Sequence, residues 1–191
     1  MTTHHEVERW SPLKVWLYTL LHRTPKSNVA IVDYANLSPT DRFLDVGCGP
    51  GAALEYALST GAKVAGVDPS ASMVARAAKR APGADVEVGS AEAIPFPDDS
   101  FTVVINVASF HHWADREAGL REIRRVLAPG GRLHVVEGKL GEDQRGHGLS
   151  TQDAVVLEAK LEELGYGDLG VDTIKTGRRH EYVVVSATNP A

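Results

Sequence analysis

The chain has 191 residues, of which 43% are hydrophobic and 24% are charged, and its formal net charge at pH 7 is −5. This length and composition are typical of a globular protein with one core, and the acidic balance argues against non-specific binding of nucleic acid. Cys48 is the only cysteine, so no disulfide forms within the chain, and we expect a reducing, cytoplasmic location. The longest early apolar run, residues 15–21, is too short to cross a bilayer, and we expect neither a membrane span nor a secretory signal peptide.

Short apolar runs alternate with helical segments through the middle of the chain. Two helices are predicted first, one from Ser11 to about residue 23 and a shorter one within residues 27–36. Strands are then expected at residues 42–46, 62–68, 84–89, 101–107 and 131–137, with helices starting near residue 51, over 70–80 and over 115–127. Alternating strands and helices indicate a parallel sheet that is covered on both faces, and the valine-rich strands are typical of buried parallel strands.

The end of the chain predicts a change of strand direction. Residues 138–149 are glycine-rich and lack periodicity, which indicates a loop. Residues 150–153 have the form of a capping box, and Gly165 is placed to end the helix that follows. Apolar runs at residues 170–174 and 180–187 are separated by five residues, a length that joins antiparallel strands directly. The sheet is therefore expected to end in an antiparallel pair.

The segment "LDVGCGPGAALEYAL", residues 44–58, indicates a ligand site. An apolar strand ends at Asp45, three glycines follow at alternate positions, and a helix starts after them. Glycines let a ligand approach the backbone, and helix N–H groups attract anions. Gly47, Gly49 and Ala52 even satisfy the dinucleotide pattern G-x-G-x-x-G/A, so the glycines alone leave the ligand open, and a tight turn without any ligand is the alternative.

The residues around the glycines favour a ligand without phosphates. Pro50 removes one N–H from the turn, and the carboxylate of Asp45 repels a pyrophosphate but attracts a cation; alternatively, Asp45 caps the N–H groups of the turn. Asp68 closes the second strand, 21 residues after Gly47, a spacing at which an acid accepts hydrogen bonds from both ribose hydroxyls. The alternative for Asp68 is an N-cap of the next helix, although Ser70 can fill that position instead.

Five motifs in order carry a resemblance: "LDVGCGPG", "VAGVDPSASMVARA", "GSAEAIPFPDDSF", "VASFHHW" and "EIRRVLAPGGRL". Together they resemble the class I S-adenosylmethionine-dependent methyltransferases, in particular the small-molecule group related to the ubiquinone and sterol enzymes. The resemblance implies a Rossmann-like, three-layer α/β fold with a mostly parallel seven-stranded sheet and an antiparallel last hairpin. It also implies a single methyltransferase domain over residues 1–191, with helices in 1–40, a cofactor-binding core in 41–137 and a C-terminal part in 138–191.

The resemblance further implies a set of residues that bind S-adenosylmethionine, which are Asp45, Gly47, Gly49, Gly51, Asp68, Pro69, Ser70, Met73, Ala91, Glu92, Asn106 and Val107. The glycines pass beneath the methionine part, and Asp68 holds the ribose. Residues 69–73 flank the adenine, and residues 91–92 match a position that contacts it, although an aspartate is more usual just before them. Asn106 and Val107 face the amino end of the methionine. A zwitterionic sulfonium suits Pro50 and Asp45 better than NAD does.

Methyl transfer from a sulfonium needs alignment of donor and acceptor rather than a nucleophilic side chain. A base is needed if the acceptor is a hydroxyl or a carbon acid. His111 and His112 follow the strand at 101–107 and are the candidates for this catalytic role, lining an acceptor pocket with Trp113. The alternative is that one histidine packs and the other is solvated. His4 and His5 have no third ligand nearby, so we expect no metal.

The sequence thus predicts a methyltransferase that acts on an unidentified small-molecule acceptor. One alternative is a non-catalytic S-adenosylmethionine-binding partner or regulatory protein, and a weaker one is an NAD-dependent oxidoreductase. Residues 10–23 are expected to form one wall of the acceptor pocket, with residues 138–149 as a gate, unless that helix simply packs on the sheet. Nothing in the sequence sets the oligomeric state.

Overall fold

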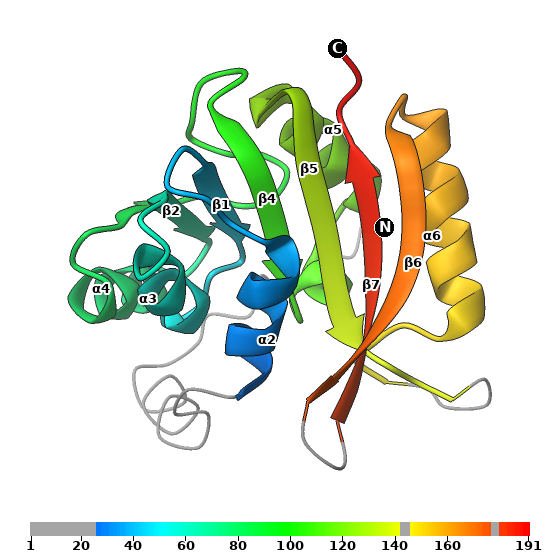
Figure 1. The fold of residues 1–191 in the computed structure, drawn as a ribbon, viewed down its shortest axis with the longest axis horizontal. Coiled ribbons are helices and arrows are strands. Elements are labelled where there is room, and N and C mark those ends of the chain that lie inside the picture. The colour runs from blue at the N-terminus through cyan, green and yellow to red at the C-terminus, as the bar shows by residue number, and fades with distance from the viewer. Residues whose placement is uncertain (1–25, 142–145, 177–179) are drawn as a thin grey trace, which may run out of the picture.

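The computed structural model describes residues 26–141, 146–176 and 180–191, which form a seven-stranded sheet of order β3-β2-β1-β4-β5-β7-β6 (Figure 1). The strands are β1 (Arg42–Val46), β2 (Lys63–Asp68), β3 (Asp85–Val88), β4 (Phe101–Val107), β5 (Leu127–Gly138), β6 (Gly167–Thr176) and β7 (His180–Thr188). Strands β1 to β5 pair in parallel, whereas β7 pairs antiparallel with both β5 and β6. The predicted fold, including its antiparallel last hairpin, is confirmed.

Helices cover both faces of this sheet, which gives the three layers that the resemblance implied (Figure 1). They are α2 (Lys26–Ala35), α3 (Ala52–Leu58), α4 (Ala71–Arg80), the short 3-10 helix η1 (Phe110–His112), α5 (Arg116–Val126) and α6 (Thr151–Glu163). Among the helices of the described residues, none is long and apolar enough to cross a membrane. The helix expected before residue 24, and with it the proposed pocket wall at residues 10–23, lies outside the described residues.

Two apolar cores lie on opposite faces of the sheet because successive side chains of a strand point in opposite directions. In β4, Val103 and Ile105 belong to the core beneath α2, α3 and α4, whereas Val104 belongs to the core beneath α5 and α6. In β1, Phe43 belongs to the core beneath α2, α3 and α4, and Leu44 belongs to the core beneath α5 and α6. Both faces of these strands are buried, which is why their sequences read as continuous apolar runs rather than as alternating ones.

Helix α6 is capped at both ends as its sequence predicts. The Ser150 hydroxyl accepts a hydrogen bond from the Asp153 N–H at 3.1 Å, and the Asp153 carboxylate accepts one from the Ser150 N–H at 3.0 Å. At the other end Gly165 has a φ of 84°, a left-handed conformation that glycine adopts without strain. This turn lets the N–H of Tyr166 donate to the carbonyl oxygen of Leu161 at 3.0 Å.

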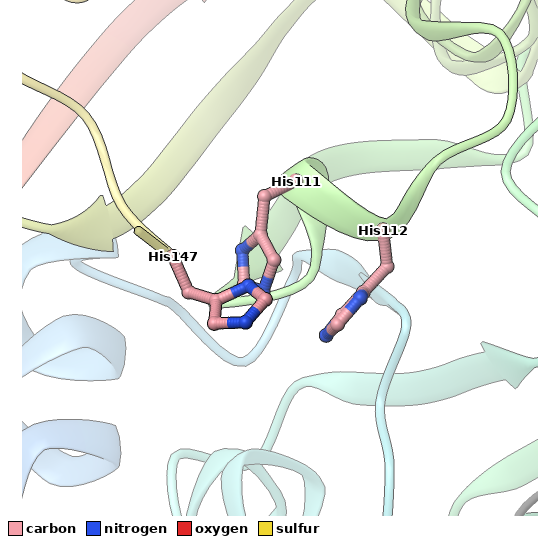
Figure 2. A group of neighbouring side chains, drawn as sticks. All are labelled: His111, His112 and His147. Carbon is pink, nitrogen blue, oxygen red and sulfur yellow. The ribbon is translucent and has the colours of Figure 1, made fainter. Parts of the chain in front are cut away.

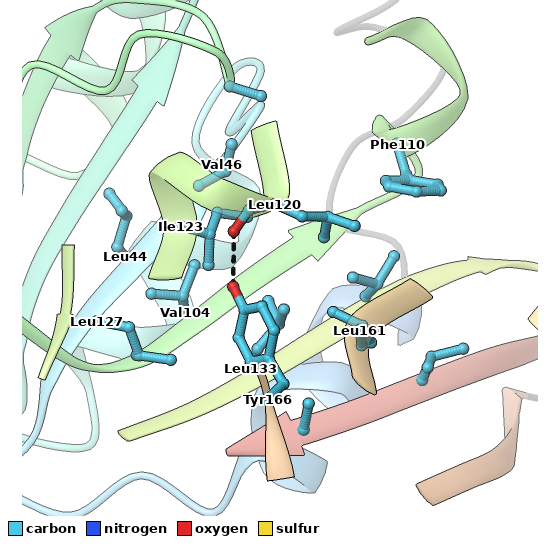
Figure 3. Close-up of a cluster of buried hydrophobic side chains, with 14 of the residues drawn as sticks. Leu44, Val46, Val104, Phe110, Leu120, Ile123, Leu127, Leu133, Leu161 and Tyr166 are labelled. Atoms are coloured by element: carbon cyan, nitrogen blue, oxygen red, sulfur yellow. Dashed lines mark hydrogen bonds between the residues drawn. The ribbon is translucent and has the colours of Figure 1, made fainter. Parts of the chain in front are cut away.

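Tyr166 then enters the core between α5 and the sheet (Figure 3). Its ring is buried, and its hydroxyl donates to the carbonyl oxygen of Leu120 in α5 at 2.8 Å. The ring therefore contributes apolar contact while its one polar group is satisfied, which is the usual condition for burying a tyrosine. Tyr166 thus fastens the C-terminal part of the chain to the central helices.

Strand β5 begins at Leu127, earlier than the expected start at residue 131, and α5 ends at Val126. The β4–β5 register explains the difference: Phe101 pairs with Leu127, but Val103 pairs with Arg132, so β5 bulges between these pairs. The bulge contains residues 129–131, a Pro-Gly-Gly sequence that is typical of turns. A segment that looked like a connection is therefore part of the strand.

His134, in β5, is buried against α2, and its environment favours the neutral ring. Its Nδ1 lies 2.9 Å from the hydroxyl oxygen of Ser186, and its ring meets the ring of Tyr34 edge to face at 5.4 Å. Burial, and secondarily the charge of Arg132, lower the pKa of His134 to about 4 from its ordinary 6.5. Between pH 6.5 and 4 the unfolded chain therefore binds a proton at His134 that the folded protein does not bind. As a result, the free energy of unfolding falls as the pH falls through this window.

We expect the replacement His134→Gln to remove part of this acid sensitivity. Between pH 7 and pH 5 the wild-type protein should lose about 2 kcal/mol more of its unfolding free energy than the variant does, from the shift of this one group. Urea denaturation of both proteins at the two pH values measures the difference, which does not depend on any constant cost of the substitution. Equal losses in both proteins would show that His134 is not held neutral.

Candidate active site

The turn between β1 and α3 has the backbone that its glycines predict. Gly47, Gly49 and Gly51 have φ values of 78°, 51° and 80°, all in the left-handed region that favours glycine. A Cβ at Gly47 would lie 2.1 Å from the hydroxyl oxygen of Ser109, and one at Gly51 would lie 2.8 Å from Cα of Ala77. A Cβ at Gly49 would meet nothing within 4 Å. Two glycines thus let the turn pack on its neighbours, and the third borders open space.

The N–H groups of this turn are all used within the protein. Those of residues 47–51 donate over at most 3.0 Å to the carbonyl oxygens of Val67 and Cys48 and to the Asp68 carboxylate, and Pro50 has no N–H. A pyrophosphate needs several such donors. The amides of residues 47–51 are therefore not available to an anion, and Asp45 is not needed to cap them.

Asp68 ends β2 and joins the glycine turn to α4. Its Oδ2 accepts a hydrogen bond from the Gly49 N–H and its Oδ1 accepts one from the Ser70 N–H, both at 2.9 Å. The N-cap of α4 is Ser70, whose hydroxyl accepts from the Met73 N–H at 3.4 Å, so the alternative of Asp68 as N-cap is wrong. Burial raises the pKa of Asp68, and the two amides oppose that effect. Each carboxylate oxygen keeps a lone pair with which to accept from a ligand hydroxyl.

Two buried oxygen atoms beside this turn lack donors among the described residues. Asp45 is 3% exposed, and its Oδ1 has no hydrogen-bond partner there; burial, and secondarily the charge of Asp68, raise the pKa of Asp45 to about 8. Asn106 is fully buried, and its amide N–H₂ donates to the Val46 carbonyl oxygen at 2.8 Å and to the Ser109 hydroxyl, which leaves its Oδ1 without a donor. Buried acceptors are rarely left unsatisfied, so this pair fits a ligand rich in N–H donors.

The remaining predicted cofactor residues lie near the same edge of the sheet. Met73 and Ala91 are buried, Val107 is half-buried at the end of β4, and Pro69 is exposed beside Asp68. The Glu92 carboxylate accepts hydrogen bonds from the N–H groups of residues 114 and 115, at 2.9 and 3.1 Å, where α5 begins. Glu92 therefore holds the loop after η1, a role that its motif did not predict.

His111 is oriented by a buried acid that the sequence interpretation missed. Its Nδ1 lies 2.9 Å from Oε2 of Glu137, which is 1% exposed near the end of β5. Burial raises the pKa of Glu137 to about 7, against the opposing effect of the backbone amides of residues 110 and 111. Burial, followed by the charges of His147 and Arg116, lowers the pKa of His111. An acid that ends an apolar strand, as Asp45 and Asp68 also do, was the feature that could have revealed Glu137.

Trp113 and Cys48 have structural surroundings. The Trp113 ring packs edge to face on Phe110 at 5.0 Å, and a Cβ at Gly119 would lie 2.6 Å from it, so one side of this half-buried ring packs against the core. Cys48 is buried in the turn, and burial followed by the charge of Asp45 raises the pKa of its thiol. The cysteine is therefore an unreactive packing residue.

The chain is similar in sequence to known methyltransferases. A family model described as a methyltransferase domain matches residues 44–135. The chain is 39% identical over 172 residues to the 27-O-demethylrifamycin SV methyltransferase of Amycolatopsis mediterranei, covering 85% of the chain and 60% of that protein. It is 40% identical over 112 residues to the demethylmenaquinone methyltransferase of Thermus thermophilus, covering 56% of the chain and 51% of the relative.

Among solved structures, the fold is similar to that of phosphoethanolamine N-methyltransferase 2 of Haemonchus contortus in complex with S-adenosylhomocysteine, with a TM-score of 0.81. That likeness covers all of this chain and 61% of the other, at 18% identity. The chain belongs to the class I S-adenosylmethionine-dependent methyltransferases. This family overturns the alternative of an NAD-dependent oxidoreductase. The chain spans about half to three fifths of the length of these two curated relatives.

Gly47 and Gly49 differ in their surroundings, so alanine replacements at these two positions give a matched test of how the turn packs. Gly49→Ala introduces only the strain of a left-handed alanine, roughly 1–2 kcal/mol, whereas Gly47→Ala also drives a methyl group into Ser109. We expect Gly47→Ala to lower the free energy of unfolding by roughly 1–3 kcal/mol more than Gly49→Ala does, as measured by urea denaturation. Combining Gly47→Ala with Ser109→Gly should recover much of that excess. Equal losses in the two single variants would contradict the contact.

Proposed function

We propose that this protein transfers a methyl group from S-adenosylmethionine to a small-molecule acceptor. The observation that carries the proposal is the pair of unpartnered buried oxygens, Asp45 Oδ1 and Asn106 Oδ1, beside a turn whose amides are already used. An ammonium group supplies the donors that this pair lacks, and a phosphate does not. S-adenosylmethionine has such a group at its methionine end, and family membership supports the same cofactor.

The residues divide the work of holding the cofactor. Asp45 and Asn106 bind the ammonium group, and Asp68 accepts from the ribose hydroxyls while it keeps the turn closed. The open side of Gly49 leaves room for the methionine part. When bound, the cofactor supplies a methyl group on a positively charged sulfur. The full set that we propose to line this site is Asp45, Gly47, Gly49, Gly51, Asp68, Pro69, Ser70, Met73, Ala91, Glu92, Asn106 and Val107.

We further propose that His111 rather than His112 accepts the proton of an acceptor hydroxyl or carbon acid. Glu137 holds the His111 ring through Nδ1, which fixes the ring and leaves Nε2 to face the acceptor. His112 lies on the same turn, but its side chain is exposed, whereas the His111 ring is half-buried against Glu137. The acceptor itself is proposed as a small molecule on the names of the relatives, and a cytoplasmic location on the single, buried cysteine.

Calorimetry tests the cofactor. The wild-type protein should bind one equivalent of S-adenosylhomocysteine, and NAD should give no heat of binding. Asp68→Asn should weaken the binding of S-adenosylhomocysteine by about 1.5–3 kcal/mol, the scale of a lost charge-assisted hydrogen bond. Asp85→Asn, at an exposed acid where β3 begins, is the matched control and should bind normally. If Asp68→Asn binds normally but unfolds more readily, Asp68 serves the turn alone.

Turnover tests the chemistry. With a panel of hydroxyl, amine and carbon-acid acceptors, formation of S-adenosylhomocysteine in a chelator-treated assay reports methyl transfer. For a hydroxyl or carbon-acid acceptor, His111→Gln should lower turnover roughly 100- to 10,000-fold with little change in cofactor affinity, and the exposed His180→Gln should leave both unchanged. Full activity of His111→Gln would remove it from the mechanism. Cofactor binding without turnover on any acceptor would favour the non-catalytic alternative.

A further inference from the structure

Three histidines from distant parts of the sequence meet beside the candidate active site (Figure 2). His111 and His112 lie in η1, after β4, and His147 lies in the loop between β5 and α6. One nitrogen of each ring lies within 4.8 Å of those of the other two, and the ring centroids are 4.0, 4.5 and 5.5 Å apart. Three imidazoles this close place their ring nitrogens where one cation can bind to all of them.

The buried acid beneath the cluster completes a pattern that is typical of metal ligands. Histidines that bind a metal through one nitrogen usually donate the other N–H to a carboxylate, which fixes the ring and strengthens the ligand. Glu137 Oε2 lies 2.9 Å from His111 Nδ1, so the Nε2 lone pair of His111 is directed away from the core. Oε1 of Glu137 has no hydrogen-bond partner among the described residues, so this oxygen favours a cation nearby.

Backbone contacts, rather than chance packing of a side chain, bring His147 to this place. The Leu149 N–H donates to the Gly138 carbonyl oxygen, and the Leu140 N–H donates to the Leu149 carbonyl oxygen, both at 2.9 Å. A Cβ at Gly148 would lie 2.2 Å from that Gly138 oxygen, so only glycine permits this close approach. Leu149, two residues after His147, therefore anchors this loop to Gly138, the residue next to Glu137 in β5.

We propose that His111, His112 and His147 bind a divalent transition-metal ion of the zinc class and leave its fourth coordination position open. Imidazole nitrogens suit zinc, cobalt, nickel and copper, whereas magnesium and calcium require oxygen ligands. Zn–N bonds of about 2.0–2.1 Å require the three nitrogens to approach to roughly 3.4 Å of one another. His147 is exposed, so its ring can turn toward the other two by the small amount that this needs.

This site differs from our expectation of no metal, which rested on the pair His4 and His5 having no nearby third ligand. His147 lies 35 residues after His112, so their spacing along the chain does not group them. The metal site does not rest on the proposed methyl transfer, because none of its ligands holds the cofactor. At His111, however, a metal ion and an acceptor proton compete for the same Nε2 lone pair.

Cobalt binding tests the site on the full chain without an affinity tag and after dialysis against a chelator. One equivalent of Co²⁺ should produce the intense visible absorption of a four-coordinate ion, Zn²⁺ should abolish it, and Mg²⁺ should not. His147→Ala should weaken Co²⁺ binding by at least about tenfold, and Glu137→Gln should weaken it by roughly 10- to 100-fold. Far-UV circular dichroism confirms that each variant is folded, and His112→Gln, at an exposed side chain, provides an independent second ligand variant.

Two controls separate this cluster from other histidines. His180→Ala removes an exposed histidine of β7, and the double replacement of His4 and His5 removes the other adjacent pair in the sequence; both should bind Co²⁺ as the wild-type protein does. Binding that survives His147→Ala and His112→Gln, or that disappears with His4 and His5, would overturn the proposal. So would an absence of stoichiometric Co²⁺ binding to the wild-type protein.

Discussion

The bridge that Asp68 makes between Gly49 and Ser70 is the interaction on which the candidate active site depends. It holds the glycine turn after β1 against the start of α4, although the two amides belong to different βα units. The bond to Gly49 also removes a donor that would otherwise face a ligand, so no N–H group of residues 47–51 is left for an anion. One carboxylate therefore closes the turn and decides that the turn does not attract an anion.

Three buried acids end strands at this edge, and they differ in what offsets the cost of burying them. The cost of burying Asp68 is offset by two amides, and that of burying Glu137 by the backbone amides of residues 110 and 111 together with the His111 ring. For Asp45 the charge of Asp68 adds to the effect of burial, and its Oδ1 meets no donor in the described part of the chain. A group in that position stays protonated near neutral pH unless a cation binds beside it. Its missing partner is therefore best supplied by the ligand.

Most of the fold was accessible from the sequence because local pattern and global structure agree. The apolar runs that became β1, β2 and β4 are buried on both faces, and the capping box and Gly165 mark α6 because each makes the bond that its residue type allows. The start of β5 was wrong because Pro129 and the two glycines after it have the composition of a turn, and only pairing with β4 shows that they lie in a bulge. Register between strands is a tertiary property that a single strand's pattern does not contain.

The candidate site was predictable where it follows strand ends and unpredictable where it depends on loops. Asp45, Asp68 and Asn106 lie at the carboxyl ends of parallel strands. The alternation of strands and helices along the sequence is therefore enough to predict that these residues meet at one edge of the sheet. Glu137 obeys the same rule, yet the sequence interpretation did not include it. The position of His147 depends on the close approach of Gly148 to Gly138, a contact between backbones for which neither composition nor spacing gives any indication. The two parts of the candidate site thus have different origins. The strands fix the positions of the acids, whereas the loop between β5 and α6 brings His147 to them.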